Sequence, residues 1–120
     1  MLLEVLIVDD NEDITTLLHD IVSMENHKVT VATTGESAKT AIDQKQFDLA
    51  FCDLTLPDIS GWEVVEYLKA KSPETPVAII SGLGDTGPED RTHKNSIDVV
   101  LKKPFKIHEI QSVLARYATP

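Results

Sequence analysis

The chain contains 120 residues, 42% of them hydrophobic, and its 20 acidic and 11 basic residues give a formal net charge of −9. This length and composition suit a single domain over residues 1–120 with a core of its own, and they exclude a disordered chain. A surface of this charge repels the phosphate backbone of nucleic acids, so we expect no direct binding of DNA or RNA.

The N-terminal apolar stretch does not predict a membrane segment. It runs from Leu2 to Val8, is interrupted by Glu4, and is too short for a bilayer span or a signal peptide. The single cysteine, Cys52, excludes an internal disulfide and fits a reducing compartment. We therefore expect a cytoplasmic location without membrane insertion, either as a separate protein or as a module of a longer one.

Strand-like and helical patterns alternate from the first apolar run onward. Residues 5–8 and 29–32 have the short, β-branched character of strands. Apolar residues at helical spacing predict a first helix over about residues 12–25 and a second helix after Gly35. The residues that carry these two helical patterns are Ile14, Leu17, Leu18, Ile21 and Val22, and then Ala38, Ala41 and Ile42.

The second half of the chain continues the alternation, with strand-like runs at residues 49–52, 77–80 and 99–101. Between the first two runs, a loop from Pro57 to Gly61 precedes a third helix, which Pro73 and Pro76 end because proline cannot continue a helix. Three glycines and a proline over residues 82–88 predict a mobile loop, followed by a weak helix over about residues 89–94. The third and last helices are marked by Val64, Val65 and Leu68, and by Ile107, Ile110, Leu114 and Tyr117.

This (βα)5 order predicts an α/β fold: a doubly wound, five-stranded parallel sheet with helices on both faces. Right-handed crossover connections would bring the carboxyl ends of the strands to one edge. In open parallel sheets that edge is where ligands bind.

Four of the apolar runs end in groups that can bind a metal ion or a phosphoryl group. Asp9 and Asp10 follow the first run, and Asp53, Ser81 and Lys103 follow three others. Mg²⁺ takes a few carboxylates and keeps positions for water and phosphate oxygens, so the three aspartates suit it. Without a metal ion, such crowded carboxylates repel one another and at least one pKa should rise. With the ion, Asp53 can attack phosphorus while the hydroxyl and the ammonium contact phosphoryl oxygens.

At these separations, four segments together resemble the receiver domain of the two-component response regulators, in the CheY-like superfamily. The segments are Leu6–Asn11, Cys52–Gly61, Ile79–Gly82 and Leu101–Phe105. The resemblance covers the whole chain and implies the flavodoxin-like strand order 2-1-3-4-5. It also implies a phosphoacceptor module that takes a phosphoryl group from a sensor histidine kinase or a histidine phosphotransfer protein, and then switches conformation to control an output.

The resemblance implies a role for each of the residues at the strand ends. It implies that the domain catalyses only its own phosphorylation and dephosphorylation. It also implies a cis peptide bond before Pro104. One departure from the family is Val100, where an aromatic residue is usual three positions before the lysine. The implied roles are phosphoacceptor for Asp53, direct Mg²⁺ ligand for Asp10, mainly water-mediated ligand for Asp9, backbone carbonyl ligand for Thr55, and phosphoryl contacts for Ser81 and Lys103.

Three other functions are weighed against this one. A haloacid-dehalogenase-type phosphatase also uses a strand-end aspartate and Mg²⁺, but it needs a second aspartate where this chain has Thr55, and the chain leaves no room for a cap domain. A flavin or nucleotide binder lacks a glycine-rich fingerprint after the first strand. A degenerate receiver that acts only as a scaffold is disfavoured because all the site residues are present.

Several conspicuous residues have plainer interpretations. Cys52 is predicted to be a buried packing thiol, Lys102 a surface residue, and Trp62 a partly exposed residue off the apolar stripe of its helix. The basic segment over residues 91–106 is interpreted as a solvated face, with an acidic protein partner as the alternative. All four histidines are predicted at the surface: His19, His27, His93 and His108.

Overall fold

The computed structural model describes residues 1–82 and 98–119. Five parallel strands form one sheet in the order β2-β1-β3-β4-β5, which confirms the predicted strand order and fold class. The strands are β1 (Glu4–Val8), β2 (Lys28–Ala32), β3 (Leu49–Asp53), β4 (Val77–Ser81) and β5 (Val99–Lys102). The described helices are α1 (Glu12–Met24), α2 (Gly35–Gln44), α3 (Gly61–Lys71) and α4 (Ile107–Ala118).

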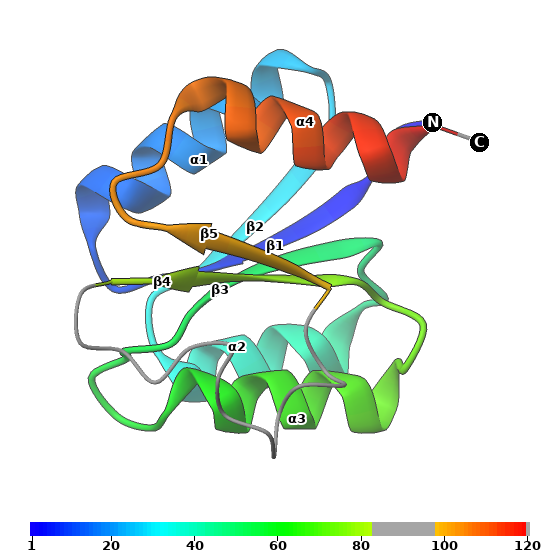
Figure 1. Cartoon of the computed structure of the whole chain (residues 1–120). Coiled ribbons are helices and arrows are strands. Elements are labelled where there is room, and N and C mark those ends of the chain that lie inside the picture. The colour runs from blue at the N-terminus through cyan, green and yellow to red at the C-terminus, as the bar shows by residue number, and fades with distance from the viewer. Residues whose placement is uncertain (83–97, 120) are drawn as a thin grey trace.

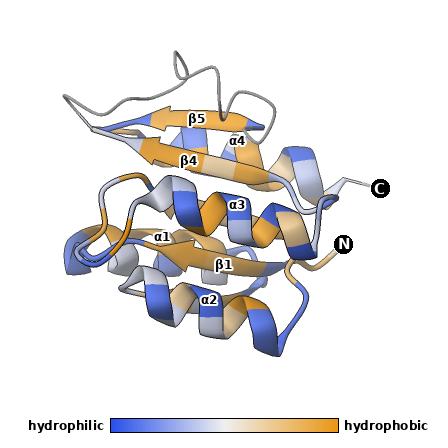
Figure 2. Ribbon diagram, turned by 90° about the horizontal axis from the view of Figure 1, so that it is seen from below, coloured by the Kyte–Doolittle hydropathy of each residue, from blue (hydrophilic) through white to orange (hydrophobic). Residues whose placement is uncertain are grey.

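The sheet is covered on both faces, by α1 and α4 on one side and by α2 and α3 on the other (Figure 1). Successive residues of a strand therefore enter different cores. In β1, Val5 and Ile7 belong to the core beneath α1 and α4, whereas Leu6 and Val8 belong to the core beneath α2 and α3. Because both faces of the sheet are buried, the strands have largely continuous apolar sequences. Figure 2 shows the same contrast, with largely hydrophobic strands and helices of mixed character.

Helix capping places the helix starts close to the strand ends. Asn11 accepts a hydrogen bond from the Ile14 amide and begins α1 immediately after Asp10. Thr34 caps α2 with a reciprocal Ser37 contact, and Ser60 caps α3. Each such cap typically contributes about 1 kcal/mol.

The strand register brings the predicted site residues to one level. Val8 pairs with Cys52, so Asp9 and Asp53 follow neighbouring positions of β1 and β3. Ser81 pairs with Lys102, and the Lys103 amide donates to the Ser81 carbonyl at 2.8 Å. The four strand ends therefore meet at the same edge of the sheet, as predicted.

Two predictions about individual side chains are wrong. Trp62 is buried, with 7% of its surface exposed, because it lies three residues before Val65 on the same face of α3 and packs into the core. His27 is also buried, and its Nδ1 accepts a hydrogen bond from the Leu3 amide at 2.9 Å, which satisfies that ring nitrogen at the sheet edge opposite the aspartates. The predictions for Cys52 as a buried thiol and for Lys102 as a surface residue are confirmed.

His19 and His108 are exposed, as predicted. The predicted weak helix over residues 89–94, nearly all of the predicted loop over 82–88, and His93 lie outside the described residues. Within the described part of the chain, no helix is both long and apolar enough to cross a bilayer.

Candidate functional site

The three predicted aspartates form one cluster at the carboxyl edge of the sheet. One carboxylate oxygen from each of Asp9, Asp10 and Asp53 lies within 4.8 Å of the others. Asp9 is completely buried and Asp53 is 3% exposed, whereas Asp10 faces solvent. Burying two carboxylates side by side is unfavourable unless a cation compensates them.

Asp9 has one satisfied and one unsatisfied oxygen. Its Oδ1 accepts the Asn11 amide at 2.9 Å. Its Oδ2 is buried and makes no hydrogen bond to any described residue. Native proteins rarely leave a buried carboxylate oxygen in this state, so the donor set fits a cation bound between the aspartates.

Lys103 supplies a positive charge beside the cluster. Its Nζ lies 3.5 Å from Asp9 Oδ2 and 3.5 Å from Asp53 Oδ2, so one ammonium bridges the two buried carboxylates. These distances describe ion pairs longer than a good hydrogen bond. The Lys103–Pro104 peptide bond is cis, as predicted.

The pKa of the Asp53 carboxyl group depends on its burial and on the charged groups beside it. Burial raises the pKa of its carboxyl group to about 6, and the neighbouring charge of Asp9 acts in the same direction. The Thr55 amide, which donates to Asp53 Oδ1 at 3.2 Å, and the Lys103 ammonium oppose that rise. The prediction that crowding raises at least one pKa is therefore confirmed, with burial as the largest cause.

Ser81 ends β4 at the same edge and is 7% exposed. Its hydroxyl donates to the Gly82 carbonyl at 3.5 Å. A contact of this length is weak, so the hydroxyl can turn toward a stronger acceptor.

The loop after Asp53 contains a residue that the sequence analysis does not single out. Asp58 accepts hydrogen bonds from the amides of Gly35 and Glu36, at the start of α2. Its partners lie more than twenty residues away in the chain, so local sequence patterns contain no signal for this contact.

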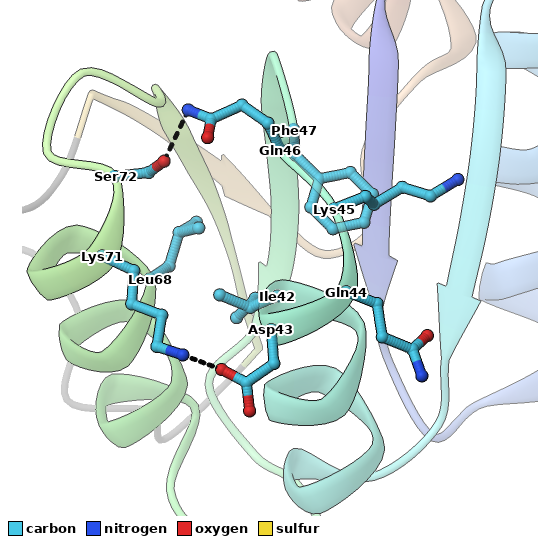
Figure 3. A pocket seen from close by; sticks show the side chains of 9 residues that line it. All are labelled: Ile42, Asp43, Gln44, Lys45, Gln46, Phe47, Leu68, Lys71 and Ser72. Atoms are coloured by element: carbon cyan, nitrogen blue, oxygen red, sulfur yellow. Dashed lines mark hydrogen bonds and ion pairs between the residues drawn. The ribbon is translucent and has the colours of Figure 1, made fainter.

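A separate pocket lies at the far ends of α2 and α3, away from Asp9, Asp10 and Asp53, and Figure 3 shows the side chains that line it. Most of its polar groups already have partners: Lys71 pairs with Asp43, Lys45 with Glu4, and Gln46 donates to Ser72. The residues that line this pocket therefore form no charged cluster comparable to that of Asp9, Asp10 and Asp53 at the opposite edge of the sheet.

The comparisons with known proteins agree with this geometry. Residues 5–115 match the family model of the response regulator receiver domain. The chain belongs to the response regulator receiver domain family. This receiver domain is 31% identical over 110 residues to the response regulator protein PilR of Pseudomonas aeruginosa, an alignment that covers 92% of the chain and 25% of PilR.

Two other relatives extend the comparison. The transcriptional regulatory protein TcrA of Mycobacterium tuberculosis is 30% identical over 106 residues, covering 88% of this chain and 42% of TcrA. The crystal structure of the receiver domain of NtrX from Brucella abortus superposes with a TM-score of 0.84 at 31% identity, covering 94% of this chain and 96% of that one. The chain thus spans less than half the length of these two curated relatives, but nearly all of the separate receiver domain.

Proposed function

We propose that this receiver domain accepts a phosphoryl group on Asp53 from a sensor histidine kinase or a histidine phosphotransfer protein. The observation that supports this most directly is the ammonium of Lys103, which lies 3.5 Å from each of the two buried carboxylates of Asp9 and Asp53. A carboxylate held beside a fixed cation at a strand end is positioned to attack phosphorus and to have the incoming charge compensated.

In the proposed transfer, an Asp53 carboxylate oxygen forms a bond to phosphorus as the bond between phosphorus and the donor's imidazole nitrogen breaks. The products are an acyl phosphate on Asp53 and a neutral donor histidine once the ring nitrogen is protonated. Lys103 and the Ser81 hydroxyl contact the phosphoryl oxygens.

The residues that would hold Mg²⁺ are Asp9, Asp10, Asp53 and the backbone carbonyl of Thr55, with Asp10 a direct ligand and Asp9 acting mainly through water. Asp9 Oδ2 supports this assignment, because it is buried without a hydrogen bond and its ion pair with Lys103 is long, at 3.5 Å. The ion would neutralise charge on the phosphoryl oxygens.

A protein donor suits the surface beside Lys103. An apolar hollow there is lined by Lys103 itself together with Ile14, Leu17, Pro104 and Phe105. A partner that covers this hollow would exclude water while its phosphohistidine reaches Asp53. The domain would then act in the cytoplasm and control an output through its change in conformation.

Asp53 can be tested with acetyl phosphate as a small donor. The unmodified protein should gain one phosphoryl group by intact mass when Mg²⁺ is present, and none in excess EDTA. Asp53→Asn should abolish the gain. Asp43→Asn, which removes a carboxylate at the far end of α2, is the matched control and should label normally. Undiminished labelling of Asp53→Asn would overturn the assignment.

A second assay with the same two proteins addresses catalysis on other substrates. We propose that the domain catalyses only its own phosphorylation and dephosphorylation, and the family match gives no support to a haloacid-dehalogenase-type phosphatase. Such a phosphatase would hydrolyse p-nitrophenyl phosphate with many turnovers per molecule. We expect no turnover by the unmodified protein beyond that of Asp53→Asn.

A further inference from the structure

The loop between Asp53 and α3 is closed tightly at its base. Thr55 and Ser60 form an antiparallel bridge, and the Gly61 amide donates to the Leu54 carbonyl at 2.9 Å. The Thr55 amide also donates to Asp53 Oδ1 at 3.2 Å. The residue that would offer its carbonyl to Mg²⁺ is thus tied directly to the phosphoacceptor.

The tip of the same loop is fastened to a different element. Asp58 Oδ1 accepts the Gly35 amide at 2.8 Å, and Oδ2 accepts the Glu36 amide at 3.0 Å. These are first-turn amides of α2, which lack partners within the helix, and a carboxylate is favoured at that positive helix end. The two hydrogen bonds hold the pKa of the Asp58 carboxyl group below its ordinary value, Gly35 contributing most.

The packing at this junction shows that the contact is built into the fold. Ile59 lies so close to Gly35 that a Cβ added there would meet Ile59 Cγ1 at 2.1 Å. Ile59 and Leu56 both pack against the core beneath α2 and α3. The loop therefore rests on α2 through Ile59 and is hydrogen-bonded to it through Asp58, which limits how far its base can move.

We propose that Asp58 is a positioning residue for the metal site: by anchoring the loop tip to α2, it holds Thr55 in place at the loop base. The inference rests on the proposed function, because it assumes Mg²⁺ binding by the aspartates and the Thr55 carbonyl. Both carboxylate oxygens of Asp58 accept hydrogen bonds from α2, so Asp58 would contact neither the ion nor the phosphoryl group. It acts through the closed loop, whose bridge and hydrogen bonds transmit a displacement of the tip to the base.

The test is Mg²⁺ affinity, measured by titration with the fluorescence of Trp62, the single tryptophan and a first-turn residue of α3. Calorimetry would give an independent value. Asp58→Ala should weaken Mg²⁺ binding about fivefold, equivalent to about 1 kcal/mol. Asp58→Asn keeps one acceptor oxygen, so its Mg²⁺ affinity should lie between those of Asp58→Ala and the unmodified protein.

Two controls separate positioning from simpler effects. Thr34→Ala removes the side-chain cap of the same helix end but leaves the loop contact, so it should lower the urea midpoint without changing Mg²⁺ affinity. Glu36→Gln removes a negative charge from the same helix turn and should also leave the affinity unchanged.

Unchanged Mg²⁺ affinity in Asp58→Ala would overturn the proposal and leave the phosphoacceptor assignment intact. Equal weakening by Thr34→Ala or by Glu36→Gln would likewise overturn it, because helix stability or charge would then account for the effect. Failure of the unmodified protein to bind Mg²⁺ would overturn the metal site itself, and the role of Asp58 with it.

Discussion

At the scale of single residues, ionisation of the buried Asp53 carboxyl group lowers the stability of the fold, although the proposed function requires the ionised form. Its pKa of about 6 lies above that of an exposed aspartate, so the unfolded chain ionises this group more readily than the folded one. Between about pH 4 and pH 6 the folded state binds more protons, and stability falls as the pH rises through that window. The negative charge that Asp53 would use in the proposed attack on phosphorus therefore destabilises the metal-free fold.

We expect Asp53→Asn to be more stable than the unmodified protein at pH 7 in excess EDTA, by on the order of 1 kcal/mol after screening is allowed for. The difference should shrink as the pH falls from 6 to below about 4, because the unmodified carboxyl group then becomes protonated in the unfolded state as well as in the folded state. Urea unfolding at several pH values measures this. A difference that does not vary with pH would contradict the electrostatic explanation.

Lys103 should show the opposite behaviour, because it compensates the charges of Asp9 and Asp53. Lys103→Met leaves two buried carboxylates without their cation and should lower the free energy of unfolding by about 2 kcal/mol in EDTA. Lys102→Met changes the exposed neighbour and serves as the matched control. If both variants lose the same stability, the ion pairs seen at 3.5 Å do not stabilise the fold.

At the scale of elements, two glycines determine how closely the loop after β3 approaches its neighbours. A Cβ at Gly61 would lie 2.0 Å from the Asp53 carbonyl oxygen and 2.6 Å from Leu54 Cα, which are backbone atoms. A Cβ at Gly35 would instead meet the side chain of Ile59, which can change rotamer. The start of α3 therefore tolerates a side chain in place of its glycine less well than the start of α2 does.

Gly61→Ala should accordingly destabilise the domain by about 3 kcal/mol, near the upper end for overpacked sites, and Gly35→Ala by about 1 kcal/mol. Thermal and urea unfolding would rank the two variants. The reverse ranking would show that the backbone after Asp53 shifts more easily than the Ile59 side chain repacks.

At the scale of the whole molecule, the excess of acidic residues and the two buried aspartates favour binding of a divalent cation to the folded state. A ligand that binds only the folded state stabilises it by mass action. The same ligand must therefore raise the temperature of unfolding, by an amount that grows with the logarithm of its concentration relative to its dissociation constant.

Mg²⁺ at about a hundredfold above its dissociation constant should add about 2.7 kcal/mol to the free energy of unfolding. Asp10→Asn removes the exposed carboxylate proposed as a direct ligand, with little effect on packing, so it should weaken that increment while leaving the EDTA value nearly unchanged. Thermal scans with NaCl at matched ionic strength control for general screening. An equal response to NaCl would indicate screening of the net charge without a metal site.

The sequence predicts most of the fold and the members of the site, because both depend on short patterns. Runs such as residues 77–80 have the short, β-branched character of buried strands, and their alternation with helical patterns predicts the parallel sheet of the recognised family. Asp9, Asp53 and Ser81 each follow such a run directly, and Lys103 follows one with Lys102 between. Parallel strands place their ends at one edge, so strand order alone brings these side chains together.

Only the tertiary structure decided contacts between residues with no local relation. The burial of His27 depends on the Leu3 amide, 24 residues away, and that of Trp62 on the core into which α3 packs. The tie between Asp58 and α2 depends on how two layers of the fold meet. Sequence patterns record which face of an element is apolar, whereas the partner of a polar group is set by distances across the assembled molecule.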